Sequence, residues 1–281
     1  MDSLSVQNAK GAIMQLTGNA DFDVWTTGLN AQTAAINSTK SANADGSTKN
    51  SASLNEKNIV LYLRIRPPVE INRNKLYRFF NAKSDVRIFY KSALLDVYID
   101  GTIENFDCEP TTNTETAIVS IICNDPYFKS AADTVYQFTN ITPLFEFPFA
   151  IPAAGIPFSE VKRNTNMIVN HGDVESGVIV EFYATTSQIL NPAFYNRTTQ
   201  KYIKILFDME QGDIIRINTN KRQKSITLIR DGVSMNILND MEIGSKWVTL
   251  EAGENEIAYG ADEGSANLSV TVSTLNKYMG V

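Results

Sequence analysis

Hydrophobic and polar residues alternate with a period of two over most of the chain. Residues 86–90 and 95–99 show this alternation in close succession, which predicts two neighbouring strands that each bury one face. Residues 103–108 and 117–123 repeat the pattern on either side of the turn-rich stretch 109–114 and predict a hairpin with a long loop. The first part of the chain is therefore expected to form an antiparallel β structure.

One segment has helical spacing instead. Leu76, Phe79 and Phe80 stand at positions i, i+3 and i+4 after the pair Pro67-Pro68. This spacing predicts a helix over residues 70–82. A helix laid over an antiparallel sheet covers one face of that sheet, so the aromatic residues are expected in the core and not in a cofactor site.

Residues 34–57 consist almost entirely of Ser, Thr, Asn, Ala, Asp, Gly and Lys, and they predict a long exposed loop or hairpin. Residues 41–46 within this stretch partly imitate a calcium-binding loop. The position that needs a bidentate Glu is occupied by Ala52, so no calcium site is expected there.

The alternating pattern breaks near residues 129–142 and then resumes, which predicts a first domain of residues 1–134 and a second of residues 135–281. The alternating segments of the second half are 178–182, 203–207, 215–217, 226–228, 247–250 and 268–272. Asp231-Gly232 lies between two strand patterns and predicts a two-residue hairpin turn with positive φ. We expect the second domain to be a β-sandwich.

Composition indicates a folded globular protein, because 43% of the 281 residues are hydrophobic and 20% are charged. The net charge of -6 disfavours stable binding to nucleic acid. The first residues lack the features of a secretory signal, so synthesis in a cytoplasm is expected. The most apolar stretch, residues 144–158, contains Glu146 and three prolines, which argues against insertion into a membrane. Cys108 and Cys123 are expected to be free thiols.

No catalytic apparatus is visible in the sequence. His171 has a turn-like surrounding sequence, and no nucleophile elbow, zinc motif or phosphate-binding loop occurs. Glu254 and Glu256 share one strand face while Ile257 and Tyr259 share the other, which predicts a charged sheet exterior and not a catalytic carboxylate pair. We therefore expect no enzyme, cofactor or metal ion, which leaves binding or assembly as the function.

Six segments of the first half form an ordered series: 24–29 (VWTTGL), 44–47 (ADGS), 59–63 (IVLYL), 74–80 (NKLYRFF), 97–104 (VYIDGTIE) and 119–128 (VSIICNDPYF). This series resembles the N-terminal domain of the distal tail protein of siphovirus-type phages. The segments 170–174, 178–182, 247–250 and 253–259 are similar to the galectin-like C-terminal sandwich of that family. One departure is Glu56-Lys57-Asn58, where the family often has arginines.

The resemblance implies a mainly β protein, with an N-terminal β-sandwich that carries one helix and a long exposed loop or hairpin, followed by a C-terminal galectin-like β-sandwich. It also implies a structural role in the virion tail. Six copies would form a homo-hexameric ring that connects the tail tube protein to the baseplate or to a tail-tip hub protein and lets DNA pass. Receptor-binding proteins are a further possible partner.

Individual residues receive structural roles in this interpretation. We expect Gly28 and Gly101 to permit turns that a Cβ atom would obstruct, and Pro126 to end the last strand of the first domain. Ring contacts are expected at Asp45 and Gly46 in the exposed stretch. They are also expected at Arg64 and Arg66, whose charges on an apolar strand need partners or solvent.

Two alternative functions remain open at the level of the sequence. The second domain is a candidate carbohydrate-binding module for host cell-wall glycans, with Trp247 or Tyr259 as the aromatic platform. A wall-degrading enzyme would need Glu254 and Glu256 as the carboxylate pair that their position disfavours.

Overall fold

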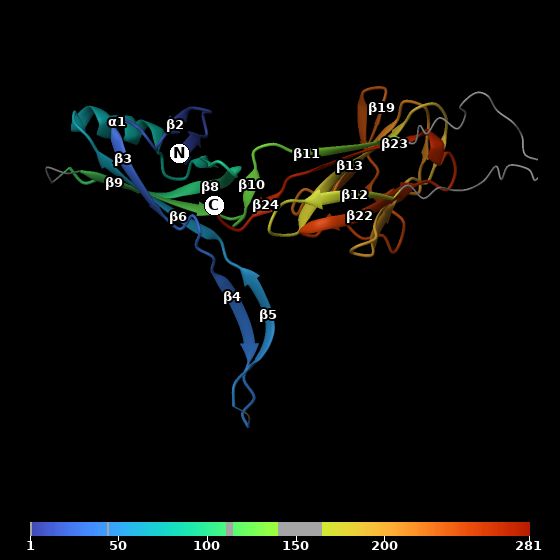
Figure 1. Cartoon of the computed structure of the whole chain (residues 1–281), viewed down its shortest axis with the longest axis horizontal. Coiled ribbons are helices and arrows are strands. Elements are labelled where there is room, and N and C mark those ends of the chain that lie inside the picture. The colour runs from blue at the N-terminus through green and yellow to red at the C-terminus, as the bar shows by residue number, and fades with distance from the viewer. Residues whose placement is uncertain (1, 44, 111–114, 140–164) are drawn as a thin grey trace, which may run out of the picture. The chain divides into compact units, whose positions relative to one another are not determined.

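The computed structural model describes residues 2–43, 45–110, 115–139 and 165–281 (Figure 1). The chain divides into an N-terminal unit, Met1–Ala131 with Lys277–Val281, and a C-terminal unit, Ala132–Asn276. The structure differs from the predicted second domain of 135–281 at the C-terminus, because Lys277–Tyr278 pairs with a strand of the N-terminal unit. The C-terminal unit is thus inserted into the N-terminal one along the sequence.

The N-terminal unit contains β1 (Ser3–Asn8), β2 (Ile13–Gln15), β3 (Phe22–Thr27), β4 (Ala34–Thr39), β5 (Thr48–Leu54), β6 (Lys57–Ile65), α1 (Val69–Phe79), β7 (Asp85–Lys91), β8 (Asp96–Asp107), β9 (Thr116–Cys123), β10 (Phe128–Ser130) and β24 (Lys277–Tyr278). Nine of these strands form one sheet among the described residues, with the order β2-β1-β7-β8-β9-β6-β3, with β10 attached to β8 and with β24 attached to β10.

Strand β8 allows this single sheet to supply both layers of a sandwich. Asp96–Thr102 of β8 pairs with β7, whereas Thr102–Asp107 pairs with β9, and a β-bulge interrupts the second pairing between Ile103 and Asn105. A bulged strand that changes partners makes a corner between layers. The separate strands predicted at 95–99 and 103–108 are therefore one strand.

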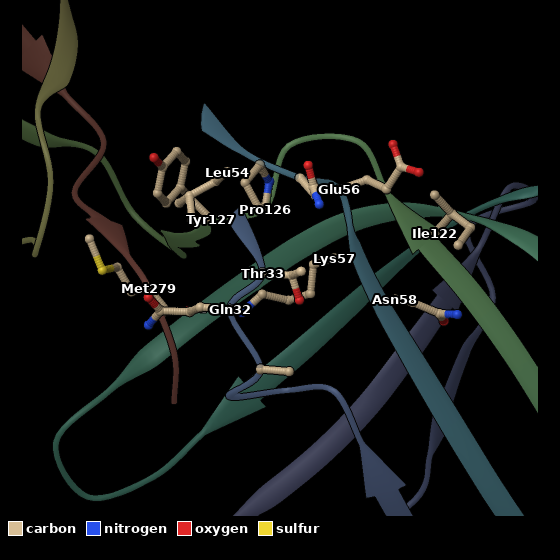
Figure 2. Close-up of a pocket in the computed structure, with 12 residues that line it drawn as sticks. Gln32, Thr33, Leu54, Glu56, Lys57, Asn58, Ile122, Pro126, Tyr127 and Met279 are labelled. Atoms are coloured by element: carbon tan, nitrogen blue, oxygen red, sulfur yellow. Dashed lines mark hydrogen bonds between the residues drawn. The ribbon is translucent and has the colours of Figure 1, made fainter. Parts of the chain in front are cut away.

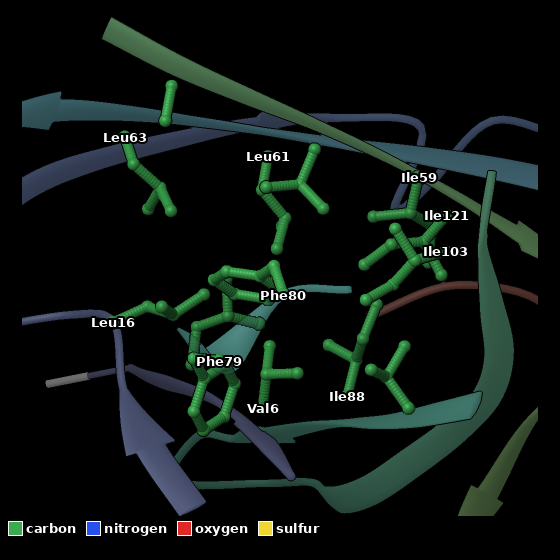
Figure 3. Close-up of a cluster of buried hydrophobic side chains, with 14 of the residues drawn as sticks. Val6, Leu16, Ile59, Leu61, Leu63, Phe79, Phe80, Ile88, Ile103 and Ile121 are labelled. Carbon is green, nitrogen blue, oxygen red and sulfur yellow. The ribbon is translucent and has the colours of Figure 1, made fainter. Parts of the chain in front are cut away.

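The core of the N-terminal unit lies between the two halves of the bent sheet. Figure 3 shows Leu61 of β6 and Val6 of β1 on opposite sides of Phe80, which directly follows α1. All three side chains are buried, as is Leu76 on the helix. The helix predicted at 70–82 is confirmed, although it ends at Phe79, where Phe80 turns to an extended conformation.

The C-terminal unit contains β11 (Thr134–Thr139), β12 (Thr165–Asn170), β13 (Ser176–Ala184), β14 (Ile189–Leu190), β15 (Ala193–Asn196), β16 (Lys201–Lys204), β17 (Asp208–Met209), β18 (Ile214–Asn218), β19 (Ser225–Arg230), β20 (Val233–Asn236), a 3-10 turn (Leu238–Asp240), β21 (Thr249–Leu250), β22 (Gly253–Gly260), a second 3-10 turn (Ser265–Asn267) and β23 (Leu268–Thr274). Its larger sheet has the order β11-β23-β13-β18-β19-β20, with β21 beside β13, and its four-stranded sheet has the order β12-β22-β15-β16.

Side chains of the two sheets form one core, as the prediction of a mainly β fold requires. Phe182 and Val272 come from the larger sheet, and Phe194 and Ile257 come from the four-stranded sheet; all four are fully buried. The turn predicted at Asp231-Gly232 joins β19 to β20, with φ values of 51° and 77° at these two residues. No helix among the described residues is long and apolar enough to span a membrane.

Candidate assembly surface

The most exposed element of the N-terminal unit is the β4–β5 hairpin, which projects from the sheet in Figure 1. The side chains of both strands are exposed except that of Leu54, which is half-buried, and Ile36 is 67% exposed. Asp45 and Gly46 lie in the loop that joins the strands, and Gly46 has a φ of 86°. The predicted exposed stretch is therefore a hairpin with no core of its own.

A pocket of about 570 Å³ lies at the root of this hairpin (Figure 2). Thr33, just before β4, and Leu54, the last residue of β5, line it together with Tyr127 and Met279. Beside them Lys57 is only 4% exposed, and its Nζ donates hydrogen bonds to the carbonyl oxygens of Leu29 at 2.9 Å and Met279 at 2.8 Å. The hairpin root and the C-terminal segment are thus held by one buried ammonium group.

The Lys57 ammonium group also lies beside an aromatic ring and a thiol. Its Nζ lies 5.0 Å from the centre of the Phe128 ring, and burial lowers the pKa of the Lys57 ammonium group. Burial also raises the pKa of the neighbouring Cys123 thiol to about 12. Sequence reasoning missed Lys57, although its position in the alternation with Ile59 and Leu61 places it on the buried face.

The outer face of β3, β6 and β9 carries an exposed aromatic stack. Trp25 on β3 is paired with Tyr62 on β6, their ring centres are 5.3 Å apart and the ring planes differ by 2°. Trp25 is 47% exposed, and Ile118 of β9 lies beside Tyr62 in the register. Because β3 is the last strand of the sheet order, this stack lies next to an open sheet edge.

The two arginines that were expected to make ring contacts, Arg64 and Arg66, differ in their surroundings. Arg66 forms an ion pair with Asp23, with Nε 3.2 Å from Oδ2, and the hydrogen bond from Arg66 lowers the pKa of the Asp23 carboxyl group. Arg64 is exposed on β6 opposite Asp23 and Thr116 and has no ion pair with a described residue. Of the two, Arg64 is the charge available to another molecule.

Three further predicted residues have structural positions. Gly28 has a φ of 90°, and a Cβ atom there would lie 1.9 Å from the Asn58 carbonyl oxygen. Gly101 does not lie in a turn: it is inside β8 at the corner, where a Cβ atom would lie 2.6 Å from Ile121 Cγ2. Pro126 follows β9 in the turn before β10, so it does not end the last strand of the unit.

The structure removes one of the residues suggested for glycan contact in the second domain and leaves the suggested carboxylates on the outer face. Tyr259 is 7% exposed and belongs to the core, which removes it as a glycan platform. Trp247 is half-buried against the core with Lys224 Nζ 5.3 Å from its ring centre. Glu254 and Glu256 lie on the outer face, and Glu256 forms an ion pair with Arg197, as expected for a charged exterior.

The residues considered for chemistry have the following positions in the part of the chain that the structure describes. His171 is exposed in the turn after β12. No group of three or more His, Cys, Asp or Glu side chains within the described ranges is arranged to hold a metal ion. Cys108 and Cys123 are free and buried.

Comparison with known proteins finds sequences and structures that are similar to this chain. Residues 171–275 match the family described as siphovirus-type tail component, C-terminal domain. No curated protein matches the sequence. The crystal structure of the SPP1 Dit (gp 19.1) protein, described as a paradigm of the hub adsorption apparatus in phages that infect Gram-positive bacteria, matches with a TM-score of 0.68 at 12% identity, over 98% of each chain.

A chain of the phage p2 baseplate in its activated conformation with Sr matches with a TM-score of 0.52 at 12% identity, over all of both chains. The same baseplate with Ca gives a TM-score of 0.50. The whole chain thus has the fold of these tail proteins, and the match at 171–275 confirms the resemblance to the siphovirus-type tail component family.

Proposed function

We propose that this protein is a structural component of a phage tail tip and that six copies close into a ring between the tail tube and the baseplate. The β4–β5 hairpin is the observation that carries the proposal. An isolated two-stranded hairpin is marginally stable in water, and this one buries almost no side chain within its own unit. Packing against a neighbouring copy gives it the contact that it lacks.

A closed ring needs two different complementary patches on each subunit. The N-terminal unit offers the hairpin as one patch. The face that carries Trp25, Tyr62 and Arg64, next to the open edge of β3, is the other. We therefore assign Arg64 and the hairpin loop at Asp45 and Gly46 to the ring contact, and we assign Arg66 to an ion pair inside the subunit.

The remaining partners follow from the same role. The ring contacts the tail tube protein on one side and a tail-tip hub protein on the other, and the C-terminal unit is available to receptor-binding proteins. We assign the protein no catalytic role and place it in the virion tail, after synthesis in the bacterial host. The net charge of -6 per copy favours passage of DNA through the ring over adhesion to it.

The mass of the purified full-length chain tests the ring. Six copies of 31.2 kDa weigh six times that value, about 187 kDa. We expect light scattering to give this mass and electron microscopy to show a closed ring with a central channel. Replacement of residues 36–52 by a short Gly-Ser turn is expected to yield a folded monomer.

The double substitution Val233→Ser and Met235→Ser is the matched control, because it removes exposed apolar side chains from β20, an edge strand of the other unit. It should leave the mass unchanged. A full-length chain that stays monomeric at the highest soluble concentration, both alone and with tail tube protein, would contradict the proposal.

A further inference from the structure

A second exposed aromatic stack lies on the four-stranded sheet of the C-terminal unit. Tyr195 of β15 is paired with Tyr202 of β16, and their ring centres are 5.7 Å apart with planes that differ by 22°. The neighbouring Phe194 and Ile203 are fully buried. Because side chains alternate along a strand, both tyrosines face outward, and Tyr195 is 38% exposed.

Hydrogen-bonding groups are fixed beside this stack. Lys204 Nζ lies 2.8 Å from Asp262 Oδ1 and 3.8 Å from Glu242 Oε1. Asn191 Nδ2 donates to Asp262 Oδ2 at 2.9 Å, and the Tyr202 hydroxyl is hydrogen-bonded to Glu242. These contacts hold the polar groups in place before any ligand arrives.

We propose that Tyr195 and Tyr202, with the adjacent carboxylates of Asp262 and Glu242, form a binding site for a neutral pyranose oligosaccharide. The apolar C–H face of a pyranose ring stacks on an aromatic face, and its hydroxyl groups donate to carboxylate oxygens. Tyr195 and Tyr202 lie on paired strands, and Asp262 and Glu242 lie in the loops that follow β22 and the first 3-10 turn. This activity goes beyond the ring and adds a recognition function to the C-terminal unit.

The local charge selects the class of ligand. One ammonium group, on Lys204, stands between two carboxylates, so the cluster carries a net negative charge. The pKa of Lys204 is raised, chiefly by its hydrogen bond to Asp262, and the pKa of Asp262 is lowered by the same contact, so both stay charged at neutral pH. A polyanion such as a glycerol-phosphate polymer would meet repulsion, whereas an uncharged sugar would not.

Binding to the full-length protein tests the site. The probes are hexamers of glucose, galactose, rhamnose and N-acetylglucosamine, with a glycerol-phosphate hexamer as the anionic comparison. We expect at least one neutral hexamer to bind, and Tyr195→Ala to weaken that binding about tenfold or more. Tyr183→Ala removes a similarly exposed tyrosine from β13 in the other sheet and should change the affinity less than twofold.

A second readout does not depend on a substitution. Hydrogen exchange of the wild-type chain with the bound sugar is expected to slow in 193–204 and at 258–262, but not in β18 or β19. The site is overturned if no neutral hexamer binds at about 5 mM, if only the anionic hexamer binds, or if protection appears elsewhere. An equal loss of affinity in the Tyr183 variant would likewise overturn it.

Discussion

The two units bury apolar cores of similar kind but close them in different ways. The N-terminal unit bends one continuous sheet at β8 and completes it with β24 from the far end of the chain. The C-terminal unit packs its larger sheet against the four-stranded sheet, and side chains of both sheets share one core. Closure of the first unit therefore depends on one bent strand and on a strand from a distant part of the chain, whereas closure of the second depends on contact between two sheets.

The largest loss of stability is expected when one methyl group is added where two backbone segments of the N-terminal unit lie close together. Gly28→Ala would place Cβ against the Asn58 carbonyl oxygen, which cannot move without displacing β6, so we expect a loss of at least about 4 kcal/mol in the free energy of unfolding. Gly232→Ala is the control in the C-terminal unit. It has a similar φ but no atom within 4 Å of the added Cβ, and it should cost about 1 kcal/mol.

Denaturant unfolding of both variants gives the two values. Equal losses would show that positive φ alone sets the cost, and the predicted effect of the close approach between Gly28 and Asn58 would then be wrong.

Removal of Lys277–Val281 tests the contribution of the C-terminal segment. Deletion removes the β10–β24 pairing, the Met279 carbonyl that accepts from Lys57, and the hydrogen bond from Val281 N to Asn30 Oδ1. We expect the N-terminal unit to lose about 3 kcal/mol. Hydrogen exchange should rise in β6 and β10 and stay unchanged in β18 and β19. Faster hydrogen exchange to the same extent in both units would contradict the view that the segment stabilises the N-terminal unit alone.

A buried charge in the C-terminal unit gives the matching test. Asp213 is 1% exposed, accepts two hydrogen bonds from Arg230 and accepts one from the backbone N–H of Glu210. Asp213→Asn removes the charge but keeps the shape, and we expect a loss of about 2 kcal/mol confined to this unit. The hydrogen bond from Arg230 lowers the pKa of Asp213, so its contribution is present above the unfolded pKa and is lost as pH falls through the folded one.

The last test is the pH dependence that the buried Cys123 thiol gives to the N-terminal unit. The Cys123 thiol has a pKa of 9.0 when unfolded and about 12 when folded. The folded state keeps its proton over this range while the unfolded state releases it, so stability falls as pH rises from 9 to 12, by about 1.4 kcal/mol per unit.

Cys123→Ala should remove this part of the slope. The buried ammonium of Lys57 acts in the opposite direction, because its lowered pKa makes stability rise as pH rises toward 10.5. If wild-type stability does not change between pH 9 and 12, and the slope is the same in Cys123→Ala, the Cys123 thiol is not the source of the pH dependence.

Local patterns in the sequence predicted much of the fold. The helix near residues 70–82, the strands with clean alternation and the turn at Asp231-Gly232 follow from spacing alone, because each depends on neighbours in sequence. The corner in β8 could not be predicted from local spacing. Asp100-Gly101-Thr102 has the composition of a turn, and only the contact of Gly101 with β9 explains why it lies within a strand.

The candidate sites were less predictable, since they depend on register. Exposure of the hairpin around Asp45 was visible in its composition, but the stacks Trp25–Tyr62 and Tyr195–Tyr202 require knowledge of which strands pair and in what alignment. Alternation alone placed Tyr259 on the strand face away from Glu256, but only the packing of the two sheets shows that this face is buried and cannot be a glycan platform. Lys57 could have been found from the same alternation, had its charge not suggested an exposed position.

The first and last strands of the C-terminal unit are direct neighbours: Thr134 of β11 is paired with Thr274 of β23. A module that begins and ends at one place can be exchanged for another compact module with adjacent ends, without altering the path of the chain that carries it. Residues 132–276 can thus be replaced by another compact module while the N-terminal unit retains both of its chain segments.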